Sequence, residues 1–78
     1  MNAGHRVKTS LVAMQKVIGN AVTAARKRER LTQQELAQLM KTRQANISRI
    51  ERGMQNLSLD LLLRLDQALG LGLKITVR

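Results

Sequence analysis

One segment in the middle of the chain carries the side chains best suited to specific recognition. On a helical wheel of residues 44–52, one side gathers Ala45, Ser48, Arg49 and Arg52, and Gln44 lies in the first turn. A glutamine can form two hydrogen bonds with adenine, an arginine can form two with guanine, and an alanine can contact the methyl group of thymine. These residue types predict a surface that reads base edges in the major groove of duplex DNA.

The other side of the same wheel predicts how that surface is held. Ile47, Ile50 and Glu51 cluster there and are expected to face the protein core. Asn46 lies toward the rim of the outer side, where its amide can also reach a base. The competing interpretation is a polar surface that only contacts water, and the charge of the whole chain favours DNA instead.

That charge is strongly positive, because the chain contains 14 Lys or Arg and 5 Asp or Glu, a formal net charge of +9. Such a chain attracts polyanions, of which duplex nucleic acid and anionic lipid surfaces are the two general candidates. The chain has no Phe, Tyr or Trp, so it lacks the stacking platforms of single-strand binders and the aromatic anchor of many lipid-surface helices. No apolar run approaches the roughly 18 residues of a membrane span. Double-stranded DNA is the expected partner, with no membrane.

The residue types give no support for catalysis. The chain has no Cys and a single His, His5, and it shows neither a phosphate-binding loop nor a carboxylate pair free of a structural role. We therefore expect no enzymatic activity, no metal and no cofactor. The absence of Cys and of a signal-peptide pattern favours a cytoplasmic location.

Two short helices are expected at the centre of the chain. Thr32 and Glu35 form the T-x-x-E pattern of a capping box, which opens a helix of two turns. A second short helix spans residues 44–52 and ends before Gly53. Two short helices joined by three or four residues form a helix-turn-helix arrangement.

A longer helix is expected on each side of this pair. Apolar residues recur at spacings of three or four before it, most reliably over residues 17–29. After it, residues 59–69 form a helix between a Ser58 cap and Gly70. Seven of these eleven residues are apolar, so this helix is expected to be covered on more than one side.

The chain divides into three parts. Residues 1–8 show no periodicity and are expected to be a flexible basic arm, solvated or lying in a minor groove; residues 9–70 form the helical domain. Residues 71–78 alternate between apolar and polar types, which predicts a strand. We expect that strand to pair with its copy in a second subunit, rather than to dock on its own fourth helix or join the sheet of another protein. The dimerisation residues are Leu71, Leu73, Ile75 and Val77.

Two compound motifs resemble the Xre-type, or lambda-repressor-like, helix-turn-helix family. They are R-K-R-E-R-L-T-Q-Q-E-L-A at residues 26–37 and R-Q-A-N-I-S-R-I-E-R-G at residues 43–53, followed by S-L-D-L-L-L-R-L-D-Q-A-L-G at residues 58–70. The resemblance spans roughly residues 18–70. Together with the alternating C-terminal segment, it implies an all-α fold: a lambda-repressor-like bundle of four helices, with one C-terminal β-strand pairing between the subunits of a dimer.

The resemblance also implies roles for individual residues. Gln33 is expected to bind a phosphate and to brace Gln44, and Arg26 and Glu51 are expected to form a structural ion pair between the first and third helices. The base-contacting residues would be Gln44, Ala45, Asn46 and Arg49. The phosphate-contacting residues would be Thr32, Gln33, Lys41, Arg43, Ser48, Arg52, Gln55 and Asn56.

Three positions depart from the family pattern. Lys41 stands where the turn usually has Gly, Arg43 where the third helix usually has a Ser or Thr cap, and Arg30 where Gly often ends the first helix. A non-Gly residue in the left-handed region costs on the order of 1 kcal/mol. Each replacement is a cation, which favours phosphate binding at the expense of stability.

The last eight residues resemble a narrower group. The usual fifth helix is replaced by L-G-L-K-I-T-V-R, as in the HipB-like subgroup of antitoxins, whose last strand pairs between subunits. This resemblance implies a homodimeric, sequence-specific transcriptional repressor that binds double-stranded DNA. It would be the antitoxin of a type II toxin–antitoxin pair, with a toxin protein as partner, and would autoregulate its operon. The alternative is a phage or restriction-system regulator with no toxin partner.

Overall fold

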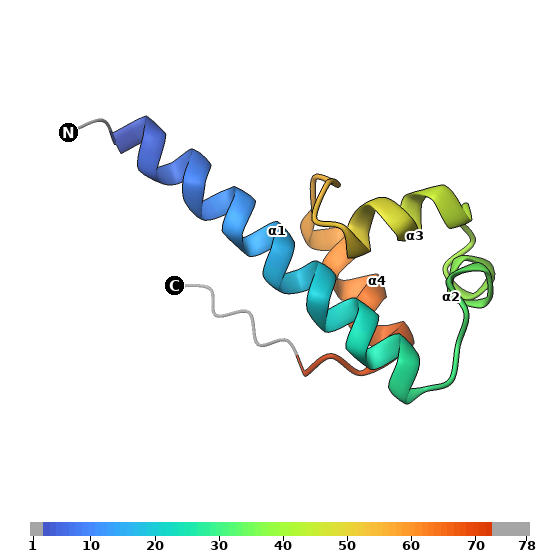
Figure 1. Cartoon of the computed structure of the whole chain (residues 1–78). Helices are drawn as coiled ribbons and strands as arrows, with labels where there is room; N and C mark the ends of the chain where they lie inside the picture. The colour runs from blue at the N-terminus through green and yellow to red at the C-terminus, as the bar shows by residue number, and fades with distance from the viewer. Residues whose placement is uncertain (1–2, 73–78) are drawn as a thin grey trace.

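Four α-helices make up the described part of this chain: the structure, a computed structural model, describes residues 3–72, and the side chains of residues 11–72. The helices are α1 (Ala3–Arg28), α2 (Gln33–Leu39), α3 (Gln44–Glu51) and α4 (Leu59–Leu69), as Figure 1 shows. α3 packs against both α1 and α2, and α4 packs against α1. The first half of α1 extends beyond the other helices (Figure 1). The expected all-α fold with a helix-turn-helix is confirmed, and no strand occurs within residues 3–72.

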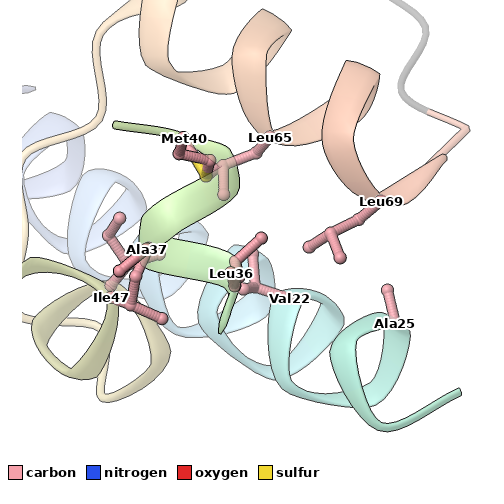
Figure 2. Close-up of a cluster of buried hydrophobic side chains, with 9 residues drawn as sticks. Val22, Ala25, Leu36, Ala37, Met40, Ile47, Leu65 and Leu69 are labelled. Carbon is pink, nitrogen blue, oxygen red and sulfur yellow. The ribbon is translucent and has the colours of Figure 1, made fainter. Parts of the chain in front are cut away.

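A small apolar core joins the four helices (Figure 2). Each helix contributes one side chain with no exposed surface, because α1 supplies Val22, α2 Leu36, α3 Ile47 and α4 Leu65. Burying a side chain of this size stabilises a fold by about 1.5 to 3 kcal/mol. The core therefore fixes α3, with Ile47 facing inward, relative to all three other helices. The other buried apolar residues are Ala25, Ala37, Met40, Ile50 and Leu69.

Local signals set the starts of α2 and α4 as expected. The hydroxyl of Thr32 accepts a hydrogen bond from the backbone N–H of Glu35 at 3.0 Å, and the Glu35 carboxylate accepts one from the N–H of Thr32 at 2.9 Å. This capping box satisfies two backbone donors at the start of α2. At α4, the Ser58 hydroxyl accepts from the N–H of Leu61 at 3.0 Å, and Gly70 ends the helix with φ 62°. Both predicted caps are confirmed.

The N-terminal boundary differs from the one expected. The sequence predicts an arm over residues 1–8, whereas α1 begins at Ala3, so this expectation is wrong for residues 3–8. Extending an existing helix adds one backbone hydrogen bond for each residue that becomes ordered, and residues 3–8 contain no proline to stop it. Apolar periodicity reports burial rather than helix formation, so it gave no signal here.

The start of the expected C-terminal strand also differs. Gly70 and Gly72 both have positive φ values, 62° and 71°, which turn the chain instead of extending it. The N–H of Gly72 donates to Asp66 Oδ1 at 3.0 Å, and Leu71 packs against the protein's own core. Leu71 therefore lies against the core of its own chain, and its expected pairing with a second subunit stays a prediction. The other three dimerisation residues, Leu73, Ile75 and Val77, lie outside the described residues.

Candidate nucleic-acid interface

The third helix has one buried side and one open side. Ile47 and Ile50 are 0% and 3% exposed, while Ala45, Arg49 and Arg52 are exposed, as the helical wheel predicts. No side chain caps the start of α3, because Arg43 occupies the cap position and its guanidinium makes no capping hydrogen bond. The backbone N–H groups of Gln44 and Ala45 are therefore open to an outside acceptor such as a phosphate, whereas the N–H of Asn46 donates to the carbonyl of Arg43 at 3.0 Å.

The open side of α3 forms one wall of a groove of about 410 Å³. The lining contains two guanidinium groups and no carboxylate, so the groove is positively charged. Amide and hydroxyl groups supply donors and acceptors beside these charges. Such a surface fits the edges of base pairs and the phosphates next to them. The lining residues are Gln33, Gln44, Ala45, Ser48, Arg49 and Arg52.

An ion pair beneath the groove ties α1 to α3. Arg26 Nε donates to Glu51 Oε2 at 2.6 Å and Arg26 Nη2 donates to Oε1 at 3.1 Å, with the two side chains only 13% and 6% exposed. Arg26 Nη1 also donates to the carbonyl of Leu31 at 2.8 Å, so the guanidinium holds the loop before α2 as well. The ion pair that the resemblance implied is therefore present in the structure.

The Glu51 carboxylate has further donors. Thr23 Oγ1 donates to Oε1 at 3.0 Å and Gln33 Nε2 donates to the same oxygen at 3.2 Å. Burial on its own would raise the pKa of Glu51, but the hydrogen bonds from Arg26, Gln33 and Thr23 and the charge of Arg26 lower it overall. The hydrogen bonds and charge of Glu51 likewise raise the pKa of Arg26, against the opposing effect of burial. The carboxylate is therefore ionised at neutral pH.

Gln33 connects this buried pair to the groove. Its Oε1 accepts from Gln44 Nε2 at 3.4 Å, so the expected contact between the two glutamines is present. Hydrogen bonds thus run from α1 through the end of α3 and the start of α2 to the first turn of α3. Sequence reasoning missed Thr23, although it lies three residues before Arg26 and so shares that face of α1.

Asn46 is more constrained than the wheel suggests. Its Nδ2 donates to Thr42 Oγ1 at 2.8 Å, which ties the amide back to the turn before α3, and the residue is half-buried. Asn46 does not line the groove. Thr42 was not anticipated, and its spacing of four residues before Asn46 is the signal that would have found it.

Two of the cations that depart from the family pattern occupy strained backbone. Arg30 and Lys41 have φ values of 58° and 54°, in the left-handed region. Each closes a helix: the N–H of Leu31 donates to the carbonyl of Arg26 at 3.0 Å after α1, and the N–H of Thr42 donates to the carbonyl of Ala37 at 2.9 Å after α2. Gly53 fills the equivalent position after α3. Both cations therefore stand where glycine would be favoured.

The remaining expected phosphate ligands lie outside the groove. Lys41 borders a separate groove between the end of α2 and α4, where Arg64 Nη2 donates to the carbonyl of Met40. In the loop after α3, Asn56 Oδ1 accepts from Gln15 Nε2 at 3.2 Å, which fixes the loop against α1. The structure thus gathers the expected base-contacting residues other than Asn46 in the groove. The expected phosphate ligands that do not line the groove are Thr32, Lys41, Arg43, Gln55 and Asn56.

Two other kinds of site are absent from the part of the chain that the structure describes. Across residues 11–72, whose side chains are described, no group of three or more His, Cys, Asp or Glu side chains is placed to hold a metal ion. None of the helices within residues 3–72 is long and apolar enough to cross a membrane.

A known family model matches more than half of the chain. Residues 22–75 match a family model described as Helix-turn-helix, and this range contains α2, α3, α4 and the end of α1. The match therefore includes every residue that lines the groove beside α3. No curated protein and no solved structure matches the chain.

Proposed function

Because the chain belongs to the Xre-like helix-turn-helix family, we propose that it is a transcriptional repressor that binds double-stranded DNA in a sequence-specific manner, with α3 as its recognition helix. The observation that carries this proposal is the groove beside α3, whose lining combines two arginines and two glutamines with no carboxylate. Side chains of these types distinguish base pairs in the major groove.

Residue roles follow from position on this surface. Gln44, Ala45 and Arg49 contact bases from the groove, and Asn46 contacts a base at its rim. Arg52 and Ser48, on the same side of α3, hold the flanking phosphates together with the open N-terminus of α3. The other phosphate contacts are assigned to Thr32, Gln33, Lys41, Arg43, Gln55 and Asn56.

A dimer is the second part of the proposal. Two copies related by a two-fold axis would place their recognition helices about 34 Å apart, one turn of DNA, and would bind a near-palindromic operator. The alternation of Leu73, Ile75 and Val77 supports pairing of the C-terminal segments between subunits. Ile75→Asp is expected to give monomers in sedimentation and much weaker operator binding. Unchanged sedimentation would refute dimerisation through this segment.

A narrower role is proposed from the resemblance of residues 71–78 to the HipB-like subgroup. The protein would be the antitoxin of a type II toxin–antitoxin pair, would bind its toxin and would repress its own operon. The other candidate is a phage or restriction-system regulator with no toxin. A neighbouring toxin gene whose product co-purifies with this chain supports the first candidate, and the absence of both supports the second.

The proposal assigns the protein no catalytic activity and a cytoplasmic location. The first assignment rests on the sequence, which has no Cys and no His paired with another catalytic side chain.

The proposed function is tested by selecting duplexes from a random pool at a stated salt concentration. Enrichment of one near-palindromic sequence is expected, because two symmetric copies read two related half-sites. The contrary result is the same affinity for every duplex and for vesicles of anionic lipid. It would show that the protein binds polyanions through its positive charge, without recognising bases. That result would reject the proposal.

A further inference from the structure

The Glu51 carboxylate lies at the inner end of a chain of hydrogen bonds that reaches the groove. Glu51 Oε1 accepts from Gln33 Nε2 at 3.2 Å, and Gln33 Oε1 accepts from Gln44 Nε2 at 3.4 Å. The Glu51 side chain is 6% exposed, Gln33 is half-buried and Gln44 is exposed. The two amides therefore connect a fixed buried charge to a side chain on the surface.

The charge of Glu51 sets the direction of each bond in this chain. An ionised carboxylate can only accept hydrogen bonds, so Gln33 must turn its NH₂ group toward Glu51 and its carbonyl oxygen toward Gln44. Gln44 must then donate its own N–H to that oxygen. Reversing either amide would bring two oxygens face to face, and the network itself thereby assigns both amide orientations.

The fixed orientation of the Gln44 amide determines which of its hydrogen-bonding groups remain available to a base. After one N–H is donated to Gln33, a second N–H and the carbonyl oxygen are left, and neither takes part in another hydrogen bond among residues 11–72. An acceptor beside a donor is complementary to adenine, which presents N6–H and N7 in the major groove. Guanine presents O6 and N7, two acceptors, and one of them would face the Gln44 oxygen.

We propose that Glu51 is a positioning residue for base selection: acting through Gln33, it holds the Gln44 amide in the orientation that accepts adenine and rejects guanine. This inference rests on the proposed function and specifies what the groove selects at one base pair. An unanchored glutamine can instead turn its NH₂ group toward guanine and donate to O6 or N7, both of which are acceptors. The anchored amide cannot do so without losing its bond to Gln33.

The test first locates the base pair that Gln44 contacts. The duplex selected by the wild type is bound to Gln44→Ala, and the position whose base preference relaxes is the one that Gln44 reads. At that position the wild type is expected to bind adenine about tenfold more tightly than guanine. A preference for guanine there would overturn the inference, even with the DNA-binding function intact.

The second step removes the connection to Glu51. Gln33→Met has a similar shape but cannot hydrogen-bond to either neighbour, and Glu51→Gln replaces the obligatory acceptor with an amide that can also donate. The adenine-to-guanine ratio is expected to fall to about twofold or less in both variants. A loss of phosphate contact by Gln33 weakens binding to both duplexes equally, so it leaves this ratio unchanged.

Two further measurements separate positioning from stability. Ile50→Val weakens the core of the same helix without touching the hydrogen bonds, and its ratio is expected to equal that of the wild type. If Glu51→Gln does not fold, as judged by circular dichroism, Gln33→Met decides the matter because it leaves the Arg26 ion pair in place. A folded Gln33→Met protein that keeps the wild-type ratio would overturn the inference. A wild type with no base preference anywhere would instead reject the proposed function on which the inference rests.

Discussion

Gly19 of α1 lies directly against the carbonyl oxygen of Ile50 in α3. A Cβ atom on Gly19 would stand 2.5 Å from that oxygen and 2.8 Å from the carbonyl oxygen of Glu51. The two helices therefore meet backbone to backbone at the point where α3 ends. A glycine in mid-helix costs about 1 kcal/mol relative to alanine, and here it allows the approach that places Glu51 beside Arg26.

Gly19→Ala is therefore expected to destabilise the protein. The better helix propensity of alanine is outweighed by a contact with backbone atoms that cannot move aside, for a net loss of about 1 to 3 kcal/mol. The neighbouring Asn20→Ala, at an exposed position, serves as the control and is expected to gain about 0.5 kcal/mol. Urea unfolding measures both, and a Gly19→Ala protein as stable as the wild type would show that α1 and α3 are farther apart.

Arg26→Met tests the ion pair under the groove. Removing the arginine leaves the Glu51 carboxylate buried without its cation, which typically costs about 3 to 5 kcal/mol. Lys27→Met changes the adjacent, exposed cation and is expected to alter stability by no more than about 0.5 kcal/mol. Equal losses in the two variants would mean that the pair does not stabilise the fold.

Stability is expected to fall at acid pH through Glu51. A carboxyl group whose pKa is lowered on folding stabilises the protein at pH values above its unfolded pKa, ordinarily 4.5. This contribution is lost as the pH falls through the pKa of the folded state. The melting temperature should thus stay level from about pH 7 to 5 and decline below about pH 4. Hydrogen bonds from the backbone and side chain of Thr32 lower the pKa of the exposed Glu35, which titrates in the same direction. Glu51→Gln should show a shallower decline, and a parallel curve would assign the acid transition to other groups.

Lys41→Gly is expected to move stability and DNA binding in opposite directions. With φ at 54°, the lysine is strained by about 1 kcal/mol, which glycine relieves. The same change removes a proposed phosphate contact, so the dependence of log affinity on log salt should fall by about 1.

Arg30→Gly is the matched control for Lys41→Gly. Arg30 has nearly the same backbone conformation, with φ 58°, and is not assigned to a phosphate. It should gain similar stability with a smaller change in the salt dependence. Identical salt dependences in the two variants would show that Lys41 contributes only to net charge.

Local chemistry made part of this fold predictable. The capping box at Thr32 and Glu35, the Ser58 cap and the Gly70 stop depend on residues within a few positions of one another, and each is present. The open and buried sides of α3 follow from helical spacing alone, which is why the groove could be anticipated. The positive φ of Lys41 could be anticipated from the position that glycine usually fills.

Most of the features that escaped prediction depend on contacts between distant parts of the chain. The bond from Thr23 to Glu51 spans 28 residues, so the spacing of Thr23 and Arg26 on α1 does not reveal it without the fold. Position 19 requires glycine only because the fold places the backbone of Ile50 in contact with it. The sequence of residues 3–8 has no apolar periodicity that would predict the extension of α1 to Ala3, and the positive φ of Gly72 turns the chain near the expected start of the strand.

Base preference measured for Arg49→Ala and Arg52→Ala addresses the role of α3 most directly. Both arginines line the groove, and only Arg49 is assigned to a base. Binding of each variant to every single-base change of the selected duplex should show that Arg49→Ala loses about 1 to 3 kcal/mol and relaxes one position. Arg52→Ala should weaken binding uniformly. If Arg49→Ala also weakened all duplexes equally, α3 would not be reading the bases.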